Sequence, residues 1–319
     1  MNRDDLTDGV TDAAMGMTGV MGAEAPENAE LPEAHDPSDF PELPEDADLA
    51  ARDDLDRKGT TLLALIRSRV PADQRIGIAY SGGVDSRFVA WAVRRAGCVP
   101  VLLHVSGAHV PVWEADGAKR FADRFGMRYL DARMPDGMLP RFAAAGRERC
   151  YVCKKEMMRL AGALAKDEGI TLIADGSHAG DRQGWRPGAR AVREAGIFSP
   201  LLEADFQKHE IRELARRWGM PDADQAARPC LMTRFPYGRI PSEEELKRVA
   251  AAESALEPLV RLGLTFRVRM LPEGAVVHVG KGAAPGILKE ARVRTGLPVV
   301  EVETLSGWFD RPKEEKKPD

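Results

Sequence analysis

The sequence predicts an α/β protein with a parallel sheet of about five strands, helices on both faces of that sheet, and a small C-terminal α+β domain. Three observations lead to this fold class. Residues 76–80 and 98–105 are continuous apolar runs, which are typical of strands buried on both faces. Segments with helical spacing alternate with such runs as far as residue 218. Beyond residue 237 the order becomes helix, strand, strand, helix, strand, which indicates a second, smaller unit.

The elements of the sheet domain are expected in a regular order. Pro71 and Asp73 interrupt the chain before the first strand, and Gly97 ends the helix that precedes the second. Strands are expected at residues 76–80, 98–105, 128–131, 170–175 and 197–202. Helices are expected around residues 62–70, 88–93, 113–125, 151–168 and 208–218.

The small domain is expected to begin with a capped helix. Ser242 and Glu245 have the spacing of a capping box, and an apolar spacing follows as far as Leu259. The remaining elements are expected at residues 266–270, 275–279, 287–293 and 298–302. Small α+β units of this kind often pack against a second copy, so we expect a homo-oligomer.

The first 50 residues differ from the rest of the chain in charge. They hold 14 acidic residues and one basic residue, whereas the remaining 269 hold 36 acidic and 45 basic residues. This stretch has few aromatic residues and no sustained apolar period, so residues 1–55 are expected to be a disordered acidic tail. The sheet domain is then expected over residues 56–236, the small domain over 237–310, and a charged tail over 311–319.

Composition excludes several classes of protein. Four cysteines are too few for a disulfide scaffold, and no run approaches the roughly 20 apolar residues of a membrane span. The N-terminus lacks a basic start followed by an apolar core, so we expect a cytoplasmic protein without a signal peptide. The mildly basic body suits a phosphorylated small molecule. No dense Lys/Arg run with interleaved aromatic residues is present, so a nucleic-acid partner is not expected.

A glycine-rich turn, Ser81-Gly82-Gly83-Val84-Asp85-Ser86, joins the first expected strand to the next helix. A strand, such a turn and a helix N-terminus form an anion site, because backbone N–H groups and the helix dipole converge on one point. Gly82 and Gly83 allow the backbone to approach a phosphate closely. Ser81 and Ser86 can donate to phosphate oxygens, and Asp85 can hold Mg²⁺ against them.

Polar residues elsewhere can join this nucleotide site. Asp175 and Gly176 stand at the end of the strand expected at 170–175. Because ligands bind at the carboxyl ends of parallel strands, we expect both residues to share a pocket with the turn. Lys208 and Arg212 lie one helical turn apart and can face the phosphates together, with a solvated helix face as the alternative.

Three of the four cysteines have a suggestive placement. Cys150 and Cys153 stand at the start of a helix, where the dipole and neighbouring cations favour the thiolate, the form that acts as nucleophile and metal ligand. Cys230 lies in a loop between two prolines. The alternative is that Cys150 and Cys153 are ordinary thiols at a helix start without a functional role. Cys98 lies among apolar residues and is expected to be a buried small hydrophobe.

The glycine-rich turn resembles the pyrophosphate loop, S-G-G-x-D-S, of the PP-loop ATP pyrophosphatases, whose fold is of the adenine nucleotide alpha-hydrolase type. The chain has no G-x-x-x-x-G-K-[ST] loop. Over roughly residues 60–305 it resembles the LarE family of ATP-dependent sulfur transferases. The segments that carry this likeness are R-C-Y-V-C-K at 149–154, D-G-S at 175–177, R-P-G at 186–188, S-P-L at 199–201, K-H-E-I-R at 208–212 and C-L-M-T-R-F-P-Y-G at 230–238.

The resemblance implies an enzyme that adenylates a carboxylate of pyridinium-3,5-biscarboxylic acid mononucleotide. ATP and Mg²⁺ would be used, pyrophosphate would leave, and sulfur would be installed as a thiocarboxylate in nickel-pincer nucleotide biosynthesis. The sulfur would come from sulfide or another sulfur donor. The implied catalytic residues are Cys230, Cys150, Cys153 and Asp85.

Four arginines are candidates for binding the pyridinium nucleotide. Arg267 and Arg269 lie on the same side of an expected strand, and the likeness makes them candidates for the substrate phosphate, with plain surface charge as the alternative. Arg234 follows Cys230 closely and is expected to orient a carboxylate. Arg212 completes this set.

The likeness offers two forms of the sulfur site. In one branch of the family the cysteine that matches Cys230 gives up its own sulfur. In another branch three cysteines hold a [4Fe-4S] cluster whose open iron carries sulfide. Because Cys150 and Cys153 accompany Cys230, we favour a [4Fe-4S] cluster on these three residues. A zinc site of three cysteines is the competing metal site.

Two other functions stay open at this point. A tRNA thiolation enzyme would use the same adenylation chemistry, but it would need a basic RNA-binding surface. A non-catalytic nucleotide-binding module would have the same sheet, but it would not need Asp85 or the cysteines.

Overall fold

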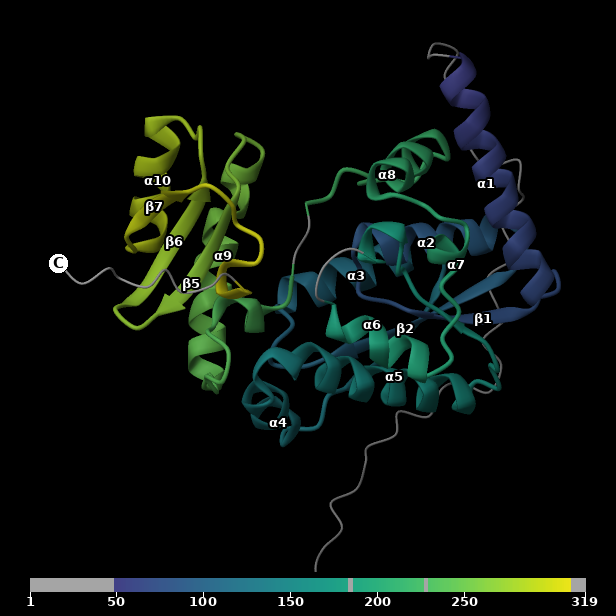
Figure 1. The fold of residues 1–319 in the computed structure, drawn as a ribbon, viewed down its shortest axis with the longest axis horizontal. Helices are drawn as coiled ribbons and strands as arrows, with labels where there is room; N and C mark the ends of the chain where they lie inside the picture. The colour runs from purple at the N-terminus through teal and green to yellow at the C-terminus, as the bar shows by residue number, and fades with distance from the viewer. Residues whose placement is uncertain (1–48, 183–185, 227–228, 311–319) are drawn as a thin grey trace, which may run out of the picture. The chain divides into compact units, whose positions relative to one another are not determined.

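The computed structural model describes residues 49–182, 186–226 and 229–310, with side chains from residue 54 onward. They contain a four-stranded and a three-stranded sheet (Figure 1). The first sheet has the order β3-β2-β1-β4 and comprises β1 (Arg75–Ala79), β2 (Val99–Ser106), β3 (Arg128–Arg133) and β4 (Ile173–Ala174). All neighbouring strands are parallel, so their carboxyl ends lie at one edge of the sheet. The α/β fold class is therefore confirmed.

Helices cover both faces of this sheet (Figure 1). One core is shared by α1 (Leu49–Arg69), α2 (Val84–Arg95), α3 (Val112–Arg124) and α8 (Lys208–Arg217). The opposite core is formed with α5 (Arg149–Asp167). Leu102 of β2 belongs to the first core, whereas its neighbours Val101 and Leu103 belong to the second, because successive strand side chains point to opposite faces.

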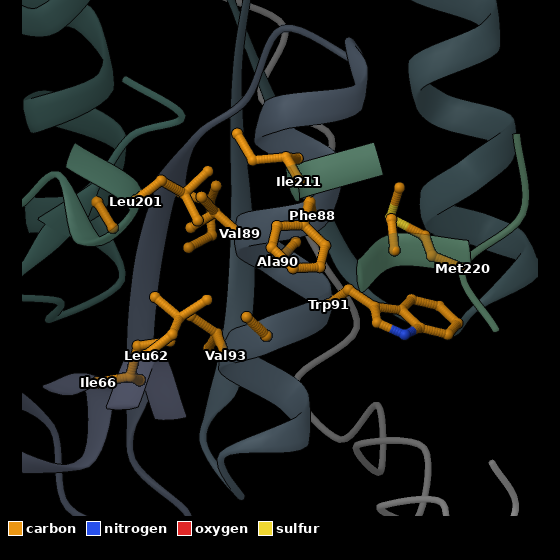
Figure 2. Close-up of a cluster of buried hydrophobic side chains, with 14 of the residues drawn as sticks. Leu62, Ile66, Phe88, Val89, Ala90, Trp91, Val93, Leu201, Ile211 and Met220 are labelled. Atoms are coloured by element: carbon orange, nitrogen blue, oxygen red, sulfur yellow. The ribbon is translucent and has the colours of Figure 1, made fainter. Parts of the chain in front are cut away.

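The core around α2 holds the helix that follows the glycine-rich turn. Figure 2 shows Leu62 and Ile66 of α1 together with Phe88 and Trp91 of α2 in this cluster. The Phe88 ring stacks on that of Trp218 at 5.3 Å, and Trp91 Nε1 donates to the Trp218 carbonyl oxygen at 2.9 Å. Burial of this kind fixes the position of the helix and therefore of its N-terminus.

The second sheet has the order β5-β6-β7. It comprises β5 (Phe266–Leu271), β6 (Gly274–Gly280) and β7 (Val299–Val302). β5 and β6 are antiparallel, and β6 pairs in parallel with β7 after the crossover helix α10 (Pro285–Thr295). The helix α9 (Glu243–Val260) precedes them, and Ser242 and Glu245 form the predicted capping box at its start.

The structure differs from the predicted elements at five places. The strand β4 covers only Ile173–Ala174 of the segment expected at 170–175. Only a single bridge, between Ala174 and Phe198, stands where the fifth strand was expected. Pro200 begins the short helix α7 (Pro200–Glu203) immediately afterwards, because proline fits the first turn of a helix but cannot donate to a strand ladder. Helices α4 (Met138–Ala144) and α6 (Pro187–Glu194) were not predicted. α1 begins at Leu49, inside the segment expected to be a tail. Short 3₁₀ turns lie at Gly146–Glu148, Ala179–Arg182, Leu231–Arg234 and Trp308–Asp310.

The rest of the acidic tail and the final charged residues, 1–48 and 311–319, lie outside the described residues. None of the helices within residues 49–310 that the structure describes has the length and apolar composition needed to span a membrane. The domain boundaries, the homo-oligomer and the cytoplasmic location stay predictions.

Candidate functional site

The glycine-rich turn between β1 and α2 has the geometry of an anion site. Gly82 has a φ of +77°, and a Cβ placed there would lie 2.7 Å from the Cβ of Ala118 on α3. Glycine is therefore required at this position. Gly83 is the N-cap residue of α2, whose first-turn N–H groups are oriented to bind an anion. The Ser86 hydroxyl donates to the Gly83 carbonyl oxygen at 3.0 Å and lies 3.3 Å from the Ser81 hydroxyl oxygen.

Asp85 and Lys208 form an ion pair between the carboxylate Oδ1 and the ammonium Nζ. Lys208 is the first residue of α8, and a capping box between Gln207 and Glu210 fixes the start of that helix. The Asp85 and Lys208 side chains are 27% and 35% exposed, so a ligand can reach them. Magnesium triphosphate offers both charges a new partner, because a carboxylate binds Mg²⁺ and an ammonium binds phosphate.

One cavity of about 2060 Å³ contains both the turn and the cysteines. Its lining includes Ser81, Gly82, Gly83, Asp85 and Lys208, together with Cys150, Cys153 and Cys230. A pocket for one small ligand is typically about 300–1,000 Å³. The cavity therefore has room for ATP and a second substrate, and the structure brings these predicted residues to one place.

Asp175 and Gly176 pack behind the turn. Asp175 is 6% exposed, and its carboxylate accepts hydrogen bonds from the hydroxyls of Ser199 at 2.6 Å and Ser177 at 2.5 Å. A Cβ on Gly176 would lie 2.9 Å from the backbone nitrogen of Ser86, so the absence of a side chain lets the two segments touch. These contacts hold the turn in place, whereas direct contact of Asp175 and Gly176 with a nucleotide stays a prediction.

Cys150 and Cys153 lie about one helical turn apart near the start of α5. Burial raises the pKa of both thiols, and the nearby Cys230 raises it further; the pKa of Cys153 reaches about 12. The positive charge of Arg149 lowers the pKa of Cys150, and that of Lys154 lowers the pKa of Cys153. Both effects are smaller than the effect of burial. Burial therefore opposes the thiolate form that the helix start was expected to favour, most strongly at Cys153, because burial disfavours the charged form. Cys230 raises the pKa of both other thiols, so the three sulfur atoms lie close enough to interact electrostatically.

His109, which no motif singled out, lies against the cysteines. Its Nε2 is 3.5 Å from Cys153 Sγ, and its carbonyl oxygen accepts a hydrogen bond from the Leu231 nitrogen at 3.0 Å. The ring packs edge-on against Phe142, and burial lowers the pKa of His109 to about 4, so the imidazole is neutral at pH 7. The only sequence signal for His109 is its place just after the carboxyl end of β2.

Arg234, expected to orient a substrate carboxylate, lies in a buried ion pair with Glu253 of α9. Its Nε and Nη2 donate to the two carboxylate oxygens, both at 2.7 Å, and the side chains are 4% and 5% exposed. Glu253 also accepts from the Val268 nitrogen of β5, and Arg234 donates to the Pro229 carbonyl oxygen, both at 3.0 Å. Removing one partner of such a pair typically costs about 3–5 kcal/mol of stability. The pair therefore anchors the segment around Cys230 to α9 and β5.

Arg267 and Arg269 of β5 have different surroundings. Arg267 lines the cavity, and burial lowers the pKa of its guanidinium. Arg269 is 2% exposed, donates from Nη1 to His278 Nδ1 at 2.9 Å, and contacts the Leu305 carbonyl oxygen with Nη2. Arg269 is thus engaged with the segment after β7 and does not line the cavity.

Arg212 and Lys208, which were expected to face the phosphates together, have different hydrogen-bond partners. Arg212 Nη2 donates to the Gln225 carbonyl oxygen at 3.0 Å, whereas Lys208 pairs with Asp85. Of the four arginines predicted to bind substrate, Arg267 alone lines the cavity within the described part of the chain.

Comparison with known proteins identifies several relatives, although no family model matches the chain. An uncharacterised protein of Synechocystis is 36% identical over 185 residues, which cover 57% of this chain and 68% of the relative. The pyridinium-3,5-bisthiocarboxylic acid mononucleotide synthase of Lactiplantibacillus plantarum is 30% identical over 207 residues, 64% of this chain and 74% of the relative. A probable tRNA sulfurtransferase of Methanothermobacter thermautotrophicus is 31% identical over 155 residues, 44% of this chain and 39% of the relative.

Proposed function

The chain belongs to the LarE family of PP-loop sulfurtransferases, and from this premise we propose that it uses ATP to insert sulfur into pyridinium-3,5-biscarboxylic acid mononucleotide. The mononucleotide synthase and the tRNA sulfurtransferase among its relatives support an enzyme of the sulfurtransferase kind, which uses ATP and Mg²⁺. The observation that carries the proposal is the single cavity that contains the phosphate-binding turn and three cysteines.

In the first half-reaction, a substrate carboxylate attacks the α-phosphate of ATP and pyrophosphate leaves. The N–H groups at the start of α2 and the Ser81 hydroxyl hold the leaving pyrophosphate. The predicted phosphate ligand Ser86 is 4% exposed and donates to the Gly83 carbonyl oxygen, so its hydroxyl instead fixes the turn. Mg²⁺, when bound by Asp85, offsets the charge of the triphosphate. Lys208 is then available to donate to the phosphates. The product is an acyl adenylate, which reacts more readily than a carboxylate because AMP is a good leaving group.

In the second half-reaction, a sulfur nucleophile attacks the acyl carbon. A C–S bond forms, the bond from the acyl carbon to the phosphate oxygen breaks, and AMP leaves with the electron pair. We assign the holding of this sulfur to Cys230 together with Cys150 and Cys153. Their place in the same cavity as the turn supports transfer before the acyl adenylate meets bulk water.

Purified protein tests the proposal directly. With ATP, Mg²⁺, sulfide and the mononucleotide, we expect release of pyrophosphate and AMP and an oxygen-to-sulfur exchange in the nucleotide, detected by mass spectrometry. Pyrophosphate release without the mononucleotide should stay at background. Thiolation of bulk tRNA in place of the nucleotide would replace this proposal with tRNA thiolation, and tight ATP binding without pyrophosphate release would indicate a nucleotide-binding module.

We further propose that Cys150, Cys153 and Cys230 hold the sulfur through a [4Fe-4S] cluster. The donor set fits this group chemically, because three thiols line one cavity and would leave one iron open for sulfide. Within residues 49–182, 186–226 and 229–310, no three His, Cys, Asp or Glu side chains already form a metal-binding group. The Cys230 segment would therefore have to approach α5 when the cluster assembles.

Spectroscopy tests the cluster. Protein purified or reconstituted without oxygen should be brown, absorb broadly near about 400 nm and contain about four iron atoms per chain. Cys153→Ala should lose this absorbance. Cys98→Ala is the matched control, because Cys98 is 3% exposed, belongs to the core around α2, and should leave the absorbance unchanged. Colourless protein, or protein that contains zinc, would exclude the cluster and favour either donation of the Cys230 sulfur itself or a zinc site.

A further inference from the structure

Arg149 is a buried cation in the wall of the cavity. It is the first residue of α5, directly before Cys150, and is 5% exposed. Its Nη1 donates to the Phe235 carbonyl oxygen at 2.9 Å, and the guanidinium carbon lies 4.2 Å from the centre of the Tyr237 ring. Arg149 also lowers the pKa of Cys150 through its charge and a hydrogen bond. The side chain is therefore fixed between the two cysteine-bearing segments.

The two groups that hold the Arg149 guanidinium in place are uncharged, the carbonyl oxygen of Phe235 and the ring of Tyr237. Within the part of the chain that the structure describes, no carboxylate forms an ion pair with it, and its Nε has no hydrogen-bond partner. The nearby Asp310 uses its Oδ1 to accept from the Tyr237 hydroxyl at 2.5 Å. Arg234, which is equally buried, is by contrast neutralised by both oxygens of Glu253.

A buried charge is costly unless an opposite charge accompanies it. An arginine that is held rigidly by neutral groups at a cavity wall therefore favours an anion in that cavity. The planar guanidinium fork suits a carboxylate or a phosphate. The turn and Lys208 already provide a site for the phosphates of ATP, whereas Arg149 adjoins the cysteines.

We propose that Arg149 binds a carboxylate of the pyridinium substrate beside the cysteines, the role that the sequence suggested for Arg234. This inference rests on the proposed function, because it needs a substrate that carries carboxylates. Arg149 then holds the pyridinium ring so that an acyl group lies close to the sulfur. The 5′-phosphate of the same nucleotide is also an oxyanion that a guanidinium can bind. The experiment below distinguishes binding of the carboxylate from binding of the phosphate.

Three nucleotides that differ only in their ring substituents provide the test. Nicotinamide mononucleotide has no carboxylate on the ring, nicotinic acid mononucleotide has one, and pyridinium-3,5-biscarboxylic acid mononucleotide has two. Binding of each to the full chain is measured by calorimetry without ATP. Arg149→Gln should weaken binding of the biscarboxylate about 10–100-fold, weaken the monocarboxylate less or equally, and leave the nicotinamide nucleotide unchanged.

Arg147→Gln is the matched control, because Arg147 is an exposed residue of the same segment and does not line the cavity. It should change each Kd by less than about twofold. Arg149→Lys keeps the charge but loses the fork, so an intermediate loss is expected. An unchanged Kd for ATP checks that each variant is folded.

Equal weakening of all three nucleotides by Arg149→Gln would mean that Arg149 binds the phosphate, and no weakening would mean that it binds neither group. Either result overturns the inference while the proposed function stands. If the wild-type chain binds ATP but none of the three nucleotides, the proposed function fails and this inference fails with it.

Discussion

Cys230→Ala is expected to lower formation of the thiolated nucleotide by at least about 10³-fold while leaving the rate of pyrophosphate release in the first turnover within about threefold of wild type. The reason is that we assign Cys230 to the sulfur-holding part of the cavity, on a different segment from the turn. Its carbonyl oxygen accepts from the nitrogen and the hydroxyl of Thr233, so the loop is held by its backbone and should survive the substitution. Both half-reactions are measured in one sample, pyrophosphate by a coupled assay and the nucleotide by mass spectrometry.

Cys98→Ala serves as the control for thiol loss in general, since the Cys98 thiol lies in the core around α2 and its hydrogen bonds to the carbonyl oxygens of Val70 and Pro71 are long, at 3.6 Å. It should retain both half-reactions. The role given to Cys230 would be wrong if Cys230→Ala still made thiolated product at a rate near that of wild type. It would also be wrong if first-turnover release of pyrophosphate fell in parallel, because the loop would then act on adenylation.

The conformation of the glycine-rich turn could be predicted from the sequence because it depends on local residues. The positive φ of Gly82 and the contact of Ser86 with Gly83 arise within six consecutive residues. The capping box of Ser242 and Glu245 is equally local, and the structure has it as predicted. The sheet covered on both faces could also be predicted from local sequence. A strand that is apolar at consecutive positions, such as β2, must be buried on both of its faces.

The roles of the arginines could not be predicted, because they depend on partners far along the chain. Arg234 is neutralised by Glu253, and Arg149 donates to Phe235, which lies 86 positions later. One sequence shows that these residues are charged, but not which of them already has an opposite charge beside it. The motif around Cys230 therefore suggested Arg234 as the substrate ligand, whereas the surroundings favour Arg149.

The effect of burial on the cysteines could not be predicted for a related reason. A position at the start of α5 suggests thiolates, because the helix dipole lowers the pKa of a thiol. Cys153 is instead packed in a cavity wall next to His109 and close to Cys230, and burial outweighs the dipole. Burial is a property of the tertiary structure, so the motif alone could not reveal it. The missing fifth strand has a simpler cause, because Pro200 ends any ladder that Phe198 begins.

Asp85→Asn is expected to lower pyrophosphate release by about 10²–10³-fold, because a Mg²⁺ ligand is lost while the shape of the side chain is kept. The amide oxygen can still accept from Lys208, so the turn should keep its conformation. Thiolated product should fall by the same factor, since the second half-reaction needs the adenylate. Raising the Mg²⁺ concentration should restore part of the rate, which a purely structural defect would not show.

Asp205→Asn is the matched control for this substitution. Asp205 has a φ of +55°, which asparagine tolerates, and its 64% exposed side chain pairs with Arg182 and does not line the cavity. It should keep pyrophosphate release within about twofold of wild type. Asp85→Asn should also leave the thiols and any iron absorbance unchanged, because Cys150, Cys153 and Cys230 belong to other segments of the cavity wall. Wild-type pyrophosphate release from Asp85→Asn would show that the turn binds ATP without the metal contact assigned to it here.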